Sequence, residues 1–150
     1  MADKVTKSII VKGGIDEIYD VWADFRNFPQ FMNNIESVTP SGEDRTQWVM
    51  KGPLDTTFEW EAKTTRMEEN SRIAWKSVEG NMKTSGQVTF KELPQDQTQV
   101  TVTLQYVPPG GVVGEAAAAL FGQPEKQLTE DLKNFKSYVE KMEDRLTTSA

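Results

Sequence analysis

The stretch Phe58-Glu59-Trp60-Glu61-Ala62-Lys63-Thr64-Thr65 alternates between apolar or small side chains and charged or polar ones. Because successive side chains of a strand point to opposite faces of a sheet, this pattern predicts a β-strand over 58–65. One face carries Phe58, Trp60, Ala62 and Thr64, and the other face is charged. An apolar sheet face has to be buried against another layer, so the fold depends on what the rest of the chain offers to cover it.

The covering layer is predicted near the C-terminus. From Glu125 onward, apolar residues recur at intervals of four and three, at Leu128, Leu132, Phe135, Val139, Met142 and Leu146. This spacing places one apolar stripe along an amphipathic helix of about twenty residues. The stripe matches the apolar face of the predicted sheet, and packing the two together buries both.

The remaining segments complete an α+β domain. Residues 4–11 predict a first strand, and the apolar stripe from Ile18 to Phe25 predicts a helix that begins near Asp16. A short second helix is expected over 29–33, and further strands are expected over 47–51, 73–77, 87–90 and 100–106. The expected order is one strand, two short helices, about six antiparallel strands and one long helix. It forms a single domain over residues 1–150.

Composition excludes several classes of function. The chain has 17 basic and 23 acidic side chains, and its net charge of −6 argues against nucleic acid as a partner. It has neither cysteine nor histidine, which excludes disulfides, thiolate nucleophiles, imidazole catalysis and the usual zinc ligands. We therefore expect no metal and no organic cofactor. No apolar run reaches the roughly 18 residues of a membrane span, and no signal peptide is recognised, so we expect a cytoplasmic protein.

Several segments together resemble a known superfamily. They are 17–24 (EIYDVWAD) with 28–32 (FPQFM), 72–77 (RIAWKS) with Gly80, 86–90 (GQVTF), 106–111 (YVPPGG) and 131–136 (DLKNFK). They resemble the START-like (SRPBCC) superfamily, in particular its polyketide cyclase/dehydrase-like branch. The resemblance implies a helix-grip fold, in which a curved antiparallel sheet of about seven strands wraps around a long C-terminal helix. It also implies an elongated apolar pocket between sheet and helix for a hydrophobic or polycyclic small molecule.

The predicted wall of this pocket consists of aromatic and apolar residues from the sheet and the helical segments. They are Phe31, Trp48, Phe58, Trp60, Trp75, Phe90, Tyr106, Phe121 and Leu128. An ordinary core also requires an aromatic row, so a packing interpretation stands beside the ligand-binding one. Tyr106 adds a hydroxyl at the end of an apolar strand face, which suits the polar end of a ligand.

Catalytic candidates are few. In the aromatase/cyclases of the superfamily, a cavity arginine with nearby hydroxyl groups orients the substrate. The resemblance aligns Thr65 with that arginine, and Arg66 follows one residue later. Arg66 shares the inner face of Trp60 if no bulge intervenes, and is otherwise a solvated arginine at a strand end. Arg66 and Tyr106 are therefore the catalytic candidates.

Three functions remain open at this stage. The leading hypothesis is binding, or binding and transport, of a hydrophobic small molecule or lipid in the cavity. The alternative is a cofactor-independent polyketide aromatase/cyclase or dehydratase that uses Arg66, Tyr106 or a cavity Ser or Thr for proton transfer. A third possibility is a stress-related or regulatory interaction module without a ligand. The sequence leaves the ligand, the catalytic status and the oligomeric state undetermined.

Overall fold

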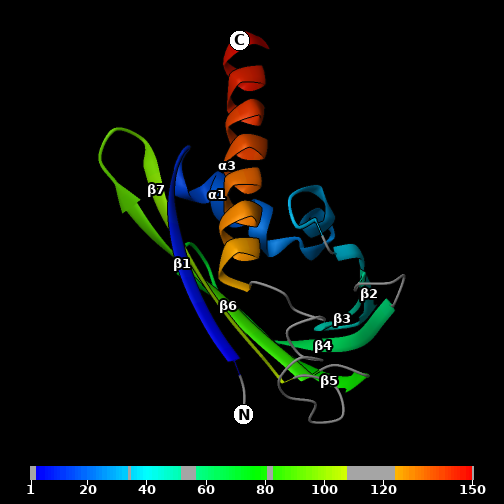
Figure 1. The fold of residues 1–150 in the computed structure, drawn as a ribbon. Coiled ribbons are helices and arrows are strands. Elements are labelled where there is room, and N and C mark those ends of the chain that lie inside the picture. The colour runs from blue at the N-terminus through cyan, green and yellow to red at the C-terminus, as the bar shows by residue number, and fades with distance from the viewer. Residues whose placement is uncertain (1–2, 34, 52–56, 81–82, 108–123, 150) are drawn as a thin grey trace.

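The computed structural model describes residues 3–33, 35–51, 57–80, 83–107 and 124–149. The seven strands in these ranges form one antiparallel sheet that curves around the long helix α3 (Figure 1). The strands are β1 (Asp3–Lys12), β2 (Ile35–Gly42), β3 (Arg45–Lys51), β4 (Thr57–Glu68), β5 (Arg72–Gly80), β6 (Lys83–Leu93) and β7 (Gln97–Val107). The helices are α1 (Ile15–Ala23), the 3-10 helix η1 (Phe25–Gln30) and α3 (Pro124–Ser149). The predicted α+β helix-grip architecture is confirmed.

Strands β2 to β7 form a meander, and the first strand, β1, pairs with the last strand, β7, at one edge of this open sheet. Its order is β1-β7-β6-β5-β4-β3-β2, so β1 and β2 are the two edge strands. The pairings among β1, β7, β6 and β5 and the pairing of β3 with β4 keep a continuous register. Register shifts interrupt the β2–β3 and β4–β5 pairings. Such shifts bend a strand and increase its twist, which gives this end of the sheet its curvature.

Two elements differ from the sequence-based expectation. β2 was not separately predicted, because Val38 is its single buried residue and Pro40 is typical of a turn. An edge strand tolerates proline, since its outward N–H has no partner strand. The second short helix is a 3-10 helix that begins at Phe25 instead of a helix over 29–33. Asp24 starts it, because the Asp24 carboxylate accepts a hydrogen bond from the Arg26 backbone N–H at 3.2 Å.

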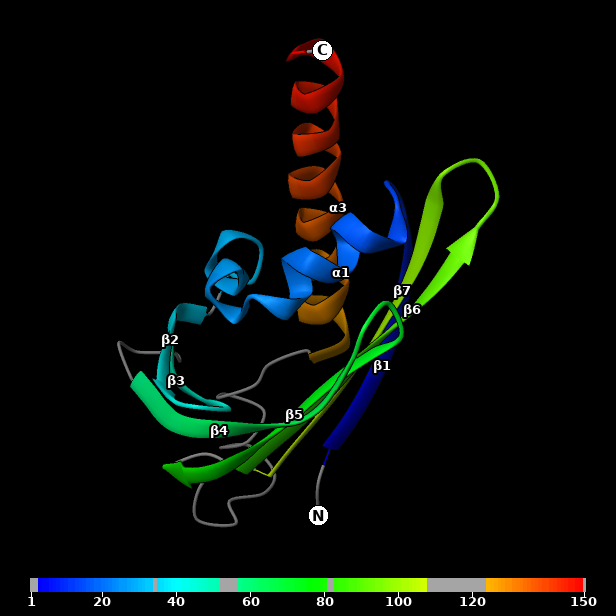
Figure 2. The ribbon, with the colours of Figure 1, turned by 180° about the vertical axis from the view of Figure 1, so that it is seen from behind.

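The apolar layers meet as predicted. The stripe of α3 is buried at Leu128, Leu132, Phe135 and Val139. Helix α1 packs against α3 through Trp22 and Phe135, whose ring centroids are 4.9 Å apart, and Figure 2 shows this crossing from behind. The side chains of Met142 and Leu146 lie outside the described part of the chain. In the described ranges, no helix combines the length and apolar character needed to cross a bilayer.

Helix α3 also covers one edge of the sheet. The Lys136 ammonium donates a hydrogen bond to the Ile10 carbonyl oxygen of β1 at 3.3 Å. The Lys12 backbone N–H donates to Glu140 at 3.1 Å, and Lys136 and Glu140 form an ion pair with each other. Edge strands present backbone groups that other chains can pair with. These two side chains occupy such groups on β1 and fix the position of α3 along it.

Candidate functional site

Three tryptophans from neighbouring strands lie nearly parallel on the inner face of the sheet. Trp48 of β3 stacks on Trp60 of β4, with centroids 5.6 Å apart and an interplanar angle of 19°. Trp48 also stacks on Trp75 of β5, at 5.9 Å and 24°. Phe25 and Phe28 contact Trp48 and Trp75 from the helical side. We call these five residues the aromatic cluster.

The positions around the aromatic cluster on β4, β5 and β6 carry small side chains. Ala62 pairs with Ser77, and Trp60 pairs with Gly80. Gly80 has a φ of 124°, and a β-carbon there would lie 2.5 Å from the Glu59 carbonyl oxygen. Gly80 is therefore required for the close approach of the two strands. It leaves Trp60 without a side chain directly across the ladder.

Gly86 has a similar role on β6, opposite Trp75. A β-carbon at Gly86 would lie 2.5 Å from Cζ2 of Trp75 and 3.0 Å from Cδ2 of Leu104. The Trp75 ring thus lies directly over the Gly86 backbone. A larger residue at this position would displace the ring from the aromatic cluster.

The indole N–H groups of the stacked pair differ. The Trp48 N–H donates a hydrogen bond to Oγ1 of Thr46 at 2.8 Å. The Trp60 N–H is buried and finds no acceptor among the described residues, and the same holds for Trp22 on α1. A buried donor without a partner costs about 1–3 kcal/mol. Such groups in a folded protein therefore call for an explanation.

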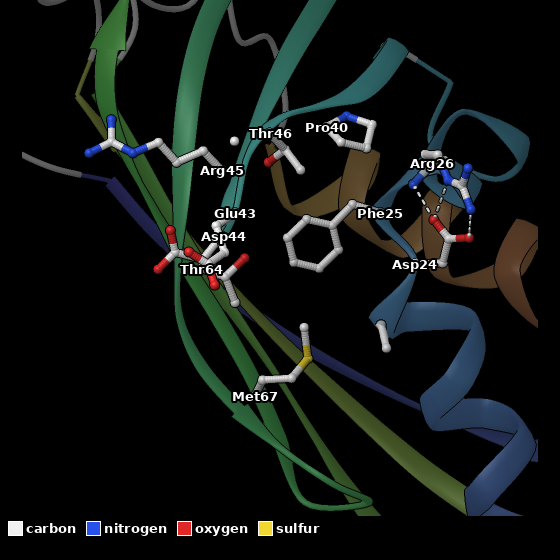
Figure 3. A pocket seen from close by; sticks show the side chains of 12 residues that line it. Asp24, Phe25, Arg26, Pro40, Glu43, Asp44, Arg45, Thr46, Thr64 and Met67 are labelled. Atoms are coloured by element: carbon white, nitrogen blue, oxygen red, sulfur yellow. Dashed lines mark hydrogen bonds and ion pairs between the residues drawn. The ribbon is translucent and has the colours of Figure 1, made fainter.

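An open pocket of about 220 Å³ adjoins the aromatic cluster (Figure 3). It lies between the α1–η1 junction, the β2–β3 turn and the inner face of β4. Its lining residues are Ala23, Asp24, Phe25, Arg26, Pro40, Gly42, Glu43, Asp44, Arg45, Thr46, Thr64 and Met67. Phe25 belongs to both the pocket and the aromatic cluster, so one ring separates the pocket from the tryptophans. Met67, which is 49% exposed, contributes an unusually accessible apolar side chain.

Two carboxylates in and near this pocket are held by ion pairs. Asp24 binds Arg26 at 2.8 Å, and this hydrogen bond lowers the pKa of the Asp24 carboxyl. Arg45 binds Glu61 at 2.9 Å, and hydrogen bonds from Ser41 and Arg45 lower the pKa of Glu61. Carboxylates held in this way stay ionised and are weak bases. Neither Asp24 nor Glu61 therefore provides a general acid or base near neutral pH.

One carboxyl group behaves in the opposite way. Asp131 of α3 is buried, and this burial raises its pKa to about 6. Its Oδ1 accepts hydrogen bonds from the Asn33 backbone N–H at 3.3 Å and from the Gln127 amide at 3.0 Å. Asp131 thereby joins α3 to the segment that leads into β2. It lies apart from the residues that line the pocket.

The described members of the predicted cavity wall are brought together in the hydrophobic core. Phe31, Trp48, Phe58, Trp60, Trp75, Phe90 and Leu128 are all buried in one hydrophobic cluster. The described pocket is lined by other residues and lies toward the β2–β3 turn, away from α3. Phe121 and the side chain of Tyr106 lie outside the described part of the chain. The contact of these nine residues with a ligand stays a prediction.

Arg66 does not point to the inner face, because a bulge does intervene. Thr64 pairs with Trp75 and Arg66 pairs with Ala74, so Thr65 is the extra residue. From this point the alternation of β4 is reversed, and Arg66 is exposed on the outer face. The interpretation of Arg66 as a solvated strand-end residue fits the structure, and its placement in the cavity is corrected.

The same bulge explains a residue that the sequence interpretation missed. Met67 pairs with the fully buried Ile73, so it returns to the inner face and lines the pocket. Strict alternation from Trp60 assigns Met67 to the outer face. Phe25 was recognised as part of a helical stripe, although its contact with the pocket required the three-dimensional arrangement. No feature of the sequence indicated the β2–β3 turn as the opposite wall.

Within the described ranges, no three acidic side chains are grouped in a way that could hold a metal ion.

Comparison with known proteins gives consistent results. The family described as "Polyketide cyclase / dehydrase and lipid transport" matches residues 13–133. A 17.2 kDa protein of Streptomyces lincolnensis is 31% identical over 137 residues, covering 91% of this chain and 89% of that protein. A START superfamily protein from Mycobacterium smegmatis has a TM-score of 0.74 at 17% identity, covering 91% of this chain and 98% of that one. An aromatase/cyclase from Streptomyces sp. R1128 has a TM-score of 0.70 at 16% identity, covering 93% and 94% of the two chains.

Proposed function

The chain belongs to the polyketide cyclase/dehydrase and lipid transport family, and from this premise we propose that it binds a hydrophobic small molecule against the aromatic cluster. The observation that carries the proposal is the row of near-parallel tryptophans on the inner sheet face, beside small residues and an open pocket. Flat apolar surfaces of this kind suit planar or polycyclic ligands. The resemblance to START-like proteins, which the comparisons confirm for the fold, supports the same class of ligand.

Apolar burial supplies most of the affinity in this proposal. Each Å² of apolar surface removed from water contributes about 25 cal/mol. Binding sites of this type add a small number of polar groups that fix the orientation of the ligand. The pocket between the α1–η1 junction and the β2–β3 turn is the route by which we propose the ligand reaches the cluster, with Phe25 at its inner end.

The cyclase alternative has less support. It needs Arg66, Tyr106 or a cavity Ser or Thr for proton transfer, and Arg66 faces outward. Asp24 and Glu61 near the pocket both have lowered pKa values, so they are unsuited to general acid catalysis. Binding therefore remains the proposed function.

The test is displacement of a neutral fluorescent probe, 1-aminoanthracene, combined with native mass spectrometry of the purified protein. We expect saturable probe binding, weakened at least about ten-fold in Trp60→Ala, because loss of a buried aromatic contact commonly costs more than 1.4 kcal/mol. Ile10→Ala is the matched control, since Ile10 is an exposed apolar residue on the distant edge strand β1. Probe binding that is equal in both variants, with both folded, would contradict the proposal.

A further inference from the structure

The indole N–H of Trp60 on β4 is a buried hydrogen-bond donor without a partner among the described residues. The side chain of Trp60 is 4% exposed. Trp48 stacks on Trp60, and the Trp48 N–H donates a hydrogen bond to the hydroxyl of Thr46. Two parallel indoles thus share one environment, and one of the two donors is left without a partner.

Ring contacts do not satisfy this donor. An indole N–H lies in the plane of its ring, so it can reach the face of a neighbouring ring only when the two rings are steeply inclined. Trp22, the other buried indole without a described acceptor, meets Phe28 and Phe31 at 72° and 62°. Trp60 meets Trp48 at 19°. The steep inclination of the rings around Trp22 is compatible with an N–H contact to an aromatic face, whereas the stacking of Trp60 on Trp48 is not.

The positions across from Trp60 and beside it carry small residues, and the backbones of β4 and β5 approach closely at Gly80. The direct partner of Trp60 on β5 is Gly80, which has no side chain. The next inner-face positions are Ala62 and Ser77, and the Ser77 hydroxyl is occupied by the backbone N–H of Thr84 at 3.0 Å. None of the side chains at these positions accepts a hydrogen bond from the indole.

We propose that the Trp60 indole N–H is the donor that binds a carbonyl oxygen of the ligand, and so determines which apolar molecules are accepted. This inference rests on the proposed function and narrows it: the ligand is a largely apolar, planar molecule that carries a ketone or ester carbonyl. A hydrocarbon of the same shape leaves the N–H buried and unpaired. The carbonyl compound completes the hydrogen bond that the protein itself does not supply.

The first test compares two probes of nearly the same size, 2-acetylnaphthalene and 2-ethylnaphthalene, by displacement of 1-aminoanthracene. The quantity measured is the ratio of their affinities in the wild type divided by the ratio in Trp60→Phe. This quotient cancels the different hydration of the two probes. We expect a quotient of about five or more, the value of one net hydrogen bond. Trp22→Phe is the matched control, and its ratio should equal that of the wild type.

A second measurement does not depend on the folding of a variant. In the ¹H–¹⁵N spectrum of the wild type, the indole N–H of Trp60 is assigned through its contacts with the Trp48 ring. We expect 2-acetylnaphthalene to shift this resonance downfield and to slow its hydrogen exchange, and 2-ethylnaphthalene to do neither. A resonance that already shows a bound water in the free protein, and keeps it with both probes, would overturn the inference.

The outcomes separate this inference from the proposed function. If both naphthalenes bind and the quotient is one, the protein binds hydrophobic molecules but Trp60 does not select carbonyl compounds. If neither naphthalene nor 1-aminoanthracene binds the folded wild type, both proposals fail. A quotient that falls equally in Trp22→Phe assigns the effect to general repacking and also overturns the role of the Trp60 N–H.

Discussion

The two halves of the sheet are built differently. Along β1, β7 and β6 the register is uninterrupted, and the inner face consists mainly of valines: Val5, Val11, Val88, Val100 and Val102. From β5 to β2 the register shifts repeatedly, and the inner face carries Trp48, Phe58, Trp60 and Trp75. Helix α3 packs against β1 in the regular half, while η1 packs against β2 at the other end.

The difference indicates that the two halves of the sheet have different roles, one in stability and one in binding. Branched aliphatic side chains on a regular ladder pack closely against a helix and leave few polar groups to satisfy. The bulged half contains an open pocket, a glycine at a φ of 124° that no other residue could replace without strain, and a buried indole without a described partner, which costs stability. Such costs are typical of functional sites. We therefore regard the regular half as the support and the bulged half as the binding region.

The largest effect on stability is expected when the Phe135 ring, which joins α3 to α1 and to the end of η1, is removed. Phe135 is fully buried, and its ring contacts Trp22 and Phe31 at 4.9 and 5.0 Å. Phe135→Ala should lower the free energy of unfolding by about 3–5 kcal/mol, because it leaves a cavity in a packed core. Denaturant unfolding measures the loss. Hydrogen exchange should accelerate first in α3 and β1, and acceleration confined to β4 and β5 would contradict the division.

A smaller effect is expected from substitution of Gly80, the glycine at positive φ in the bulged half. Gly80→Ala should destabilise the protein by about 3 kcal/mol, because alanine is disfavoured at a φ of 124° and its β-carbon would meet the backbone of β4. Gly42→Ala is the matched control, since a β-carbon there has its nearest neighbour at 3.5 Å, an ordinary contact. It should change stability by less than about 0.5 kcal/mol.

Exchange data sharpen the same experiment. Gly80→Ala should accelerate hydrogen exchange in β4 and β5 and leave β1 and β7 protected, because the latter strands keep their continuous pairing. Uniform acceleration across the sheet would show that the two halves unfold as one unit. The halves would then differ in geometry but not in local stability.

The overall fold was predictable from the sequence because it depends on repeated patterns. The alternation around Trp60 and the stripe from Leu128 to Val139 each contain many residues that agree with one period. An error at one position does not change such a pattern. β2 was harder to recognise, since an exposed edge strand with one buried residue has no alternation to detect.

The candidate site was less predictable because it depends on single residues. One extra residue at Thr65 exchanges the faces of Arg66 and Met67, and nothing in the local composition indicates it. The pocket joins the α1–η1 junction to the β2–β3 turn, segments whose proximity follows from the tertiary fold. The described aromatic residues of the predicted pocket wall are all buried together: Phe31, Trp48, Phe58, Trp60, Trp75 and Phe90. Their local spacing could not reveal which indole lacks a partner.

The smallest expected effect concerns Asp131, which joins α3 of the supporting layer to the segment before β2. Burial raises its pKa from the ordinary 3.8 to about 6, so the native state binds a proton more tightly than the unfolded chain does. Stability that depends on this group is therefore fully present below about pH 4 and is lost as the pH rises toward 6. A complete shift of this size corresponds to about 3 kcal/mol as an upper limit, and it is the net of burial, which raises the pKa, and the hydrogen bonds from Asn33 and Gln127, which lower it.

Asp131→Asn keeps an oxygen acceptor for Asn33 and Gln127 but removes the charge. We expect the variant to equal the wild type in stability near pH 4 and to exceed it by about 1–2 kcal/mol above pH 7, as measured by denaturant unfolding from pH 4 to 8. Glu130→Gln is a useful control, since the Glu130 charge also raises the Asp131 pKa and its removal should shift the wild-type transition to lower pH. A variant less stable than the wild type at pH 7.5 would mean that hydrogen bonds to the ionised carboxylate outweigh its burial. In that case the ionised Asp131 stabilises the junction between α3 and the segment before β2. This junction would then be grouped with the bulged half of the sheet and not with the supporting half.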